Sequence, residues 1–353
     1  MVFNGGILAS RGLTDAVGKT PLIRLNKISA HLGRNVWGKA EFQNPGGSVK
    51  DRAALYLIQQ AEKNGHLDPN KPDPTIVEGS AGNTAIGLAH IARARGYRTV
   101  FFMPDSQSPN KSELLKSLGS EVHRVPVVPI SNPLNFNNRA RDLAKSLPNA
   151  VWTNQFDNPA NWQAHYHTTG PEIFSQLRSA GLSTDAFTCS SGTGGTFSGV
   201  AKYLYEATEG NCKLVVADSP GSVNYPYIKF GSMETEGSSF TEGIGNKRIT
   251  ENLKEGLEAI KDVDALLVPD EETIVMIFKL LDEEGIYVGG TAALNVVAAC
   301  KVAQTLPEGS NVATILCDSG FKYSQRILSK RWLKEKKFYH IIPKHLLKYA
   351  SLD

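Results

Sequence analysis

Short apolar runs alternate with longer amphipathic segments along most of this chain. The apolar runs at residues 75–78, 98–103, 186–189 and 311–317 have the length and composition of buried strands. Further short strands are expected near residues 22–25 and 36–41, and helices at residues 85–94, at 112–119, from 197 onward and up to about 303. Strands that alternate with helices indicate an α/β fold with mostly parallel sheets.

Two glycine-rich loops each follow a predicted strand and precede a predicted helix, at residues 79–84 and 190–196. This arrangement directs loop amides and a helix N-terminus towards an anion. The glycines of the second loop allow close approach of a ligand, and its two threonine hydroxyls suit a phosphate monoester. A dinucleotide fingerprint would need glycine where Phe197 stands, and a phosphate-binding P-loop would need Gly-Lys-Ser/Thr, which this loop lacks.

The segment from Asn44 to Arg52 combines a turn with the start of a helix. Asn-Pro-Gly-Gly favours a turn, and Ser48 followed by Asp51 resembles a capping box, so a helix is expected from about Ser48. Lys50 then lies in the first turn, where the helix dipole disfavours a cation and favours the neutral amine that can form a Schiff base. Taken alone, Lys50 fits a solvated surface lysine better, so its assignment to chemistry needs support from other motifs.

Composition excludes several classes of protein. The 353 residues are enough for two domains, and 41% hydrophobic with 21% charged residues is typical of a globular protein. A formal charge of +3 does not favour nucleic-acid binding. Four cysteines without paired spacing argue for free thiols in a reducing compartment, and no apolar run approaches the roughly twenty residues of a membrane span. Residues 1–17 are expected to be a loose lead-in without a secretory signal.

Several motifs occur together in one order. They are GKTPLIRL at residues 18–25, NPGGSVKDR at 44–52, SAGNTA at 80–85, NQFDNPAN at 154–161, GTGGT at 192–196 and GIG at 243–245. In these motifs the chain resembles the cysteine synthase/cystathionine β-synthase family of pyridoxal 5'-phosphate (PLP) enzymes, from about Gly18 to Tyr323. The resemblance is nearest to the cysteine synthases.

The resemblance implies a set of site residues. It makes Lys50 the catalytic residue and the residue that carries PLP. It places the following residues around the cofactor: Asn83 at the phenolic oxygen, Gly192, Thr193, Gly194, Gly195 and Thr196 at the phosphate, Gly243 beside the imine and Ser319 at the pyridine nitrogen. It assigns the substrate carboxylate to Ser80, Gly82, Asn83, Thr84 and Gln155. No metal site is implied, and His165 and His167, two apart on an expected helix, are unsuited to one.

Three departures from the family pattern bear on these assignments. Ala81 stands where the family usually has a hydroxyl, whose loss could weaken carboxylate binding by about 1.5–3 kcal/mol. Asn110-Lys111 replaces a common Glu-Arg in the segment expected to close over substrate. Asp318 precedes Ser319, and alternation along the strand decides which of the two side chains faces the site. Residues 289–293 receive no site role.

By resemblance, the fold is that of a fold type II PLP enzyme, with two three-layer α/β domains and PLP in the cleft between them. The N-terminal domain is expected to cover residues 1–154, with its first strand crossing to the larger domain. The C-terminal domain covers residues 155–353 and includes a basic tail from residue 330, which is expected to pack on a homodimer. Residues 221–239 are expected to form a long loop.

The implied reaction is β-replacement, in which O-acetyl-L-serine and sulfide give L-cysteine through an aminoacrylate. The alternatives are condensation of serine with homocysteine, as in a cystathionine β-synthase, a cysteine or serine β-lyase, and a non-catalytic relative that binds a partner protein. The expected partners are small amino-acid and thiol or sulfide substrates, a second copy of the chain and serine acetyltransferase, without nucleic acid or a transmembrane segment. The expected location is the cytoplasm, or the mitochondrion if a targeting segment precedes this sequence.

Overall fold

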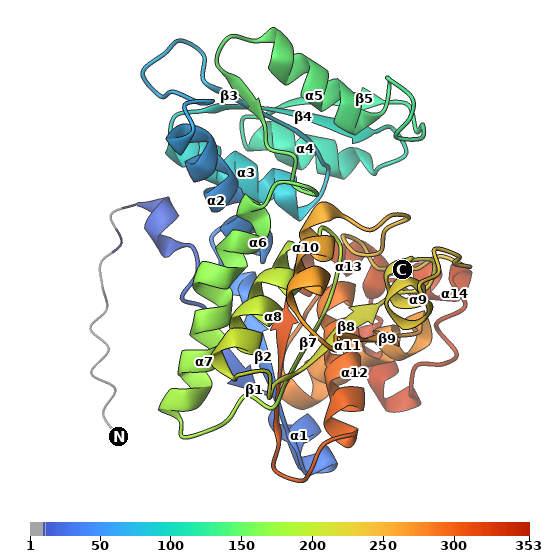
Figure 1. Ribbon diagram of the computed structural model, residues 1–353. Coiled ribbons are helices and arrows are strands. Elements are labelled where there is room, and N and C mark those ends of the chain that lie inside the picture. Colours follow the sequence, from blue (N-terminus) through green and yellow to red (C-terminus); the bar gives the residue numbers. More distant parts are fainter. Residues whose placement is uncertain (1–9, 11) are drawn as a thin grey trace.

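The computed structural model describes residue 10 and residues 12–353, and the rest of the expected lead-in lies outside the described residues. The ten strands of this part form two sheets (Figure 1). The strands are β1 (Leu22–Arg24), β2 (Asn35–Ala40), β3 (Thr75–Gly79), β4 (Arg98–Pro104), β5 (Glu121–Val125), β6 (Ala150–Trp152), β7 (Ala186–Ser190), β8 (Lys213–Asp218), β9 (Asp264–Leu267) and β10 (Asn311–Leu316). The predicted strands at residues 75–78, 98–103, 186–189 and 311–317 are confirmed to within one or two residues.

The two sheets differ in size and in which parts of the chain form them. The smaller has the order β5-β4-β3-β6 and is parallel throughout. The larger has the order β1-β2-β10-β7-β8-β9, in which only β1 is antiparallel. Both β1 and β2 therefore belong to the larger sheet, although they precede every strand of the smaller one. The exact domain boundary near residue 154 stays a prediction.

Helices cover both faces of each sheet. They are α1 (Asn26–Leu32), α2 (Lys50–Lys63), α3 (Asn83–Ala94), α4 (Pro109–Ser117), α5 (Phe136–Ser146), α6 (Ala160–Ala164), α7 (Gly170–Ser179), α8 (Gly195–Ala207), α9 (Asn224–Phe230), α10 (Glu251–Ala259), α11 (Asp270–Glu284), α12 (Gly290–Gln304), α13 (Ser324–Ile327) and α14 (Lys330–Glu335). Helices α2 and α3 share a core with one face of the smaller sheet, and α5 packs on the other. Helices α11 and α12 cover one face of the larger sheet, and α7 and α8 cover the other.

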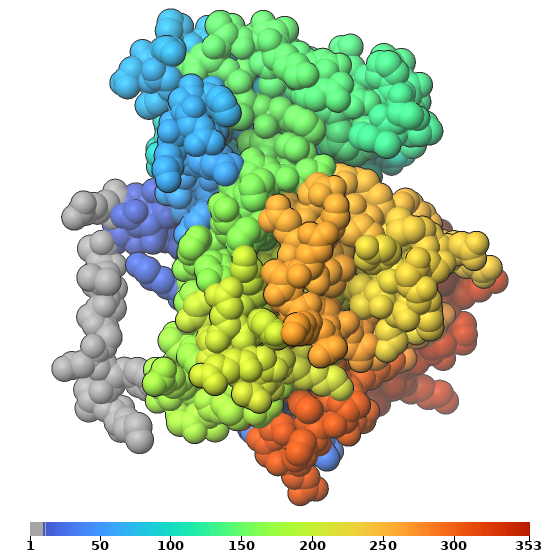
Figure 2. Space-filling model, viewed as in Figure 1, coloured from blue at the N-terminus to red at the C-terminus, as the bar shows by residue number. Residues whose placement is uncertain are grey.

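This architecture confirms the predicted α/β fold class with mostly parallel sheets. The unit built on the smaller sheet is called the small unit below, and the unit built on the larger sheet the large unit. In the space-filling view they form two lobes, with the blue-to-green small unit above the rest (Figure 2).

One expectation about an irregular segment is corrected. The segment at residues 221–239 is not a continuous loop, because it contains helix α9. The apolar side chains of the basic tail lie in the core of the large unit, and the packing of the tail on a homodimer stays a prediction. Leu333, Phe338, Ile342 and Leu346 are buried beside α11 and α12, each with at most 8% of its surface exposed. The apolar spacing in the tail thus reflects packing within the same chain.

A buried ion network joins the two units around the start of α2. The Arg52 guanidinium lies 2.7 Å from Glu41 Oε2 and 2.7 Å from Glu172 Oε1. The Lys39 ammonium lies 2.7 Å from Glu172 Oε2. Burial alone would raise the pKa of Glu172, but hydrogen bonds and charges from Arg52 and Lys39 outweigh it and hold the pKa at about 2. Glu172 therefore stays ionised at neutral pH, and the contacts of the network tie β2, α2 and α7 together.

Replacing Arg52 by Met should strongly destabilise the protein. The variant keeps most of the aliphatic stem but leaves Glu41, which is fully buried, without its guanidinium partner. Loss of one partner of a buried pair typically costs about 3–5 kcal/mol, measured here as the free energy of unfolding in denaturant. Arg248→Met is the matched control, because the Arg248–Asp157 pair is partly exposed and should contribute no more than about 1 kcal/mol. Equal effects of the two substitutions would contradict this account.

Candidate active site

A cavity of about 510 Å³ lies between the two units, at the carboxyl ends of β3, β7 and β10. Open α/β sheets commonly bind ligands at this edge. Most of the site residues expected from the sequence line this cavity together: Lys50, Ser80, Gly82, Asn83, Thr84, Gln155, Gly192, Thr193, Gly194, Thr196 and Gly243. Gly195 and Ser319 are not among the lining residues.

Lys50 is the first residue of α2 and lines the cavity. Its backbone N–H donates to Ser48 Oγ at 3.2 Å. The expected capping box does not form, because the Asp51 carboxylate accepts a hydrogen bond from the Gly46 amide of the preceding turn. The predicted placement of Lys50 in the first helical turn is confirmed, while the helix begins two residues later than expected.

The loop at residues 80–82 leads directly into α3, which begins at Asn83. Thr84 Oγ1 donates to Gln155 Oε1 at 2.5 Å, so two residues far apart in the sequence meet at the cavity wall. Glu78 lies behind them, fully buried, and accepts hydrogen bonds from Thr153 Oγ1 and from the Gly79 amide. Burial raises the pKa of Glu78 to about 7, although hydrogen bonds from Thr153, Gly79 and Gln155 lower it in part.

The second glycine-rich loop, at residues 190–196, packs closely against its neighbours and forms another wall of the cavity. A Cβ atom on Gly192 would lie 2.2 Å from the Gly243 carbonyl oxygen, and one on Gly195 would lie 2.0 Å from Asn161 Oδ1. Gly194 has φ of +86°, in the left-handed region. Glycine is therefore required at these positions for space or for backbone conformation. The loop ends at the N-terminus of the thirteen-residue helix α8, where the amides of the first turn can bind an anion.

Some hydroxyl groups around this loop form hydrogen bonds with neighbouring side chains, whereas one remains available to a ligand. Asn161 Nδ2 donates to Thr193 Oγ1 at 2.9 Å, and Thr196 Oγ1 lies 3.2 Å from His165 Nε2. Within the described part of the chain, the buried Ser190 Oγ has no hydrogen-bond partner although Ser190 lines the cavity. Burial, followed by the charges of Arg52 and Lys50, lowers the pKa of His165 well below its usual value. His165 is therefore a neutral packing residue, as the sequence favoured.

Ser319, which the resemblance places at the pyridine nitrogen of the cofactor, is not among the residues that line the cavity. Its Oγ accepts a hydrogen bond from the Phe321 amide at 3.3 Å. Thr291, at the start of α12, does line it, although residues 289–293 were given no role from the sequence. The sequence does contain an indication of this role, because Gly289-Gly290-Thr291 is a third glycine-rich segment that leads into a helix. Ser319 as a pyridine ligand stays a prediction.

Cys317 and Tyr323 also line the cavity, and neither was expected there from the sequence. Burial raises the pKa of Cys317 to about 12, with the charge of Lys50 opposing the shift. The thiol therefore stays protonated at neutral pH and does not compete as a nucleophile. All four cysteines are free in the structure.

Charged side chains from both units meet at the edge of the cavity. Lys111 of α4 lies 2.7 Å from Glu242 Oε2, and Arg326 of α13 lies 2.6 Å from Glu242 Oε1. Burial raises the pKa of Glu242, but the two cations outweigh it and lower the pKa overall. Lys111, which replaces the family's usual arginine, thus forms an ion pair from the small unit to the large one.

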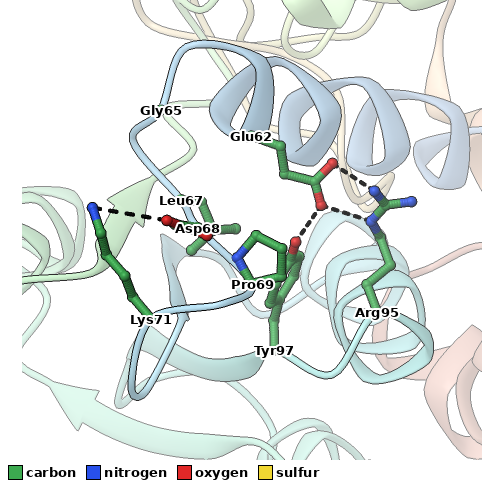
Figure 3. Close-up of a pocket in the computed structure, with 8 residues that line it drawn as sticks. All are labelled: Glu62, Gly65, Leu67, Asp68, Pro69, Lys71, Arg95 and Tyr97. Atoms are coloured by element: carbon green, nitrogen blue, oxygen red, sulfur yellow. Dashed lines mark hydrogen bonds and ion pairs between the residues drawn. The ribbon is translucent and has the colours of Figure 1, made fainter.

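A second cavity, of about 620 Å³, lies in the small unit near the end of α2 (Figure 3). Its charged groups are already paired. Glu62 accepts hydrogen bonds from Arg95 Nε at 2.8 Å and from the Tyr97 hydroxyl, and Lys71 faces Asp68 at 3.8 Å. We therefore place the chemistry in the cavity that contains Lys50. No cluster of potential metal ligands occurs among the described residues, and none of their helices is long and apolar enough to cross a membrane.

Comparisons with known proteins agree with this geometry. A family model described as "Pyridoxal-phosphate dependent enzyme" matches residues 13–318. The chain is 54% identical to "Cysteine synthase 1" of Emericella nidulans over 343 residues, which is 97% of this chain and 90% of that protein. Among solved structures it resembles O-ureido-L-serine synthase, with a TM-score of 0.79, 32% identity and coverage of 90% and 94%. It also resembles the O-acetylserine dependent cystathionine beta-synthase from Helicobacter pylori, with a TM-score of 0.76, 34% identity and coverage of 90% and 98%.

The raised pKa of Glu78 predicts a pH dependence of stability. The folded protein holds a proton on Glu78 up to about pH 7, whereas the unfolded chain releases it near its usual value of 4.5. The contribution of Glu78 to stability is therefore present below about pH 4.5 and is lost as the pH rises to about 7. The free energy of unfolding of Glu78→Gln, relative to the wild type, should rise by up to roughly 3 kcal/mol between pH 5 and pH 8. A constant difference across this range would show that Glu78 does not titrate there.

Proposed function

Because this chain belongs to the family of pyridoxal-phosphate dependent enzymes, we propose that it forms L-cysteine from O-acetyl-L-serine and sulfide by β-replacement. The observation that carries the proposal is the meeting of Lys50, the loop at residues 80–84 and the loop at residues 190–196 in one cavity. The cysteine synthase named above, more than half identical to this chain, supports the same choice of reaction.

The residues present fit PLP. Gly192 and Gly194 line the cavity and pack closely against the backbone of Gly243 and Leu253, and the N-terminus of α8 suits a phosphate dianion. Thr193 and Thr196 add hydroxyl donors, and the free Ser190 hydroxyl lies at the same cavity. We assign Lys50 to the aldehyde of PLP, the residues from Gly192 to Thr196 to its phosphate, and Gly243 to the space beside the imine.

The substrate carboxylate is assigned to Ser80, Gly82, Asn83, Thr84 and Gln155. Backbone amides at the start of α3 and the Thr84–Gln155 pair form a polar wall suited to an anion. Ala81 lies in the same wall and offers no hydroxyl. The hydrogen bond between Thr84 and Gln155 compensates in part, because it holds both side chains at the cavity before the substrate arrives.

Bound PLP supplies an electron sink that makes the α-hydrogen of the amino acid acidic. The Lys50 amine is the general base that accepts this proton. Acetate then leaves from Cβ, hydrosulfide adds at Cβ, and Lys50 returns the proton to Cα. Lys111 of α4, paired to Glu242 at the edge of the cavity, limits the access of water during these steps.

We also propose that the protein works as a homodimer in a reducing compartment such as the cytoplasm, and that serine acetyltransferase is a partner. The four free cysteines support the compartment. The dimer and the partner rest on the family resemblance.

Gly192→Ala should abolish PLP binding. The new Cβ atom would lie 2.2 Å from a backbone oxygen of Gly243, so the wall of the cavity must shift. Binding is measured by the visible absorption of the protein after titration with PLP. Gly82→Ala is the control, because nothing lies within 4 Å of its Cβ position and its φ of −110° suits alanine. Normal PLP binding by Gly192→Ala would contradict the assigned phosphate wall.

The reaction is tested with purified protein, PLP, O-acetyl-L-serine and sulfide, with cysteine as the measured product. We expect turnover by the wild type and a loss of more than about 10³-fold in Lys50→Ala, since this variant lacks the general base. Serine with homocysteine is the comparison reaction. Faster formation of cystathionine than of cysteine would replace the proposed substrates, and activity in Lys50→Ala would exclude Lys50 as the base.

A further inference from the structure

Asn83 is held by two side chains of opposite charge. Its Nδ2 donates to Asp318 Oδ2 at 2.7 Å, and its Oδ1 accepts from Lys322 Nζ at 2.8 Å. Asn83 belongs to the small unit, whereas Asp318 and Lys322 follow β10 of the large unit. The sequence raised Asp318 only as an alternative to Ser319 and indicated no role for Lys322.

These partners determine the orientation of the Asn83 amide. A carboxylate can only accept a hydrogen bond and an ammonium can only donate one, so a rotation of the amide by 180° would place like groups against each other at both ends. The amide nitrogen therefore faces Asp318. Its second hydrogen remains available to the cavity that Asn83 lines.

Asp318 is fixed from several sides. Its side chain is fully buried, and the Tyr323 hydroxyl donates to the same Oδ2 atom at 2.7 Å. Its backbone forms a bridge with Ser48, next to the turn that precedes Lys50, and its carbonyl accepts from the Gly289 amide at 3.1 Å. The acceptor for Asn83 thus has a rigid position relative to the start of α2.

Lys322 joins the same two segments. Besides Asn83, its ammonium donates to the carbonyl oxygens of Gly46 at 3.4 Å and Gly47 at 3.3 Å. One cation therefore contacts both the turn that delivers Lys50 and the first residue of α3. Three acceptors satisfy the three hydrogens of the ammonium.

We propose that Asp318 and Lys322 are positioning residues that orient Asn83, so that its amide presents a hydrogen-bond donor to the PLP ring. The inference rests on the proposed function only in its assignment of Asn83 to the cofactor. Asp318 and Lys322 act through Asn83, and neither is assigned a direct contact with substrate.

Lys322 offers the cleaner test because it lies at the surface and its replacement should preserve the fold. Lys322→Met removes the donor at similar length, and Lys322→Arg restores it. We expect Lys322→Met to shift the visible absorption band of bound PLP in the same direction as Asn83→Ala, and to weaken PLP binding by about tenfold, the loss expected for one hydrogen bond to a charged group. Lys322→Arg should resemble the wild type in both measurements.

The double variant Asn83→Ala/Lys322→Met separates this effect from the contacts of Lys322 with Gly46 and Gly47. If Lys322 acts through Asn83, the double variant should have the absorption band of Asn83→Ala alone. Equal shifts from Lys322→Met in both backgrounds would overturn the proposal, as would a wild-type band in Lys322→Met or in Asn83→Ala.

Asp318→Asn tests the other partner, and thermal unfolding of the PLP-free protein provides a readout that does not involve the cofactor. The losses in melting temperature from Asn83→Ala and Asp318→Asn should be less than additive, because both remove one contact. Additive losses together with an unchanged absorption band in Asp318→Asn would reduce Asp318 to a structural role and overturn the proposal. None of these measurements requires turnover, so a wild type that fails to make cysteine would contradict the proposed function and leave this inference standing.

Discussion

The pairing of Arg52 with Glu41 and Glu172 is the interaction on which the site most depends. Arg52 lies two residues after Lys50, so the same helical turn carries the buried cation and the reactive amine. Burial of a charge is tolerable only when its partners are in place, and these partners come from the short 3-10 helix that follows β2 and from α7. The first turn of α2 can therefore reach its final position only after segments from three parts of the chain have come together.

The cavity also depends on both units, because each unit supplies part of its lining. The small unit supplies the loop before α3 and Lys111, while the large unit supplies the glycine wall, Glu242 and the segment after β10. Side-chain contacts such as Asn83–Asp318 and Lys111–Glu242 cross between the units. Neither unit contains a complete site. A small rotation of one unit against the other would alter the polar groups that face the cavity.

Local structure was predicted best from the sequence. Strand–loop–helix steps at residues 75–94 and 186–207 follow from apolar runs and glycines, and their loops do line one cavity. Contacts between distant residues could not be predicted in this way, since Asn83 and Asp318 are 235 positions apart. The neighbours Asp318 and Ser319 illustrate the limit. Alternation along a strand could not assign them, because β10 ends at Leu316 and the two residues form isolated bridges with two different segments.

The placement of β2 in the larger sheet has a consequence for synthesis on the ribosome. The strands of the smaller sheet are contiguous in the chain, so that sheet can form as soon as residue 152 has emerged. Strand β2 has only the short β1 and the distant β10 as neighbours, and Asn35 pairs with Asn311, 276 positions later. The edge of β2 that pairs with β10 therefore stays unpaired until nearly the whole chain has been translated. A nascent chain of this protein would offer that edge to a chaperone for most of its elongation.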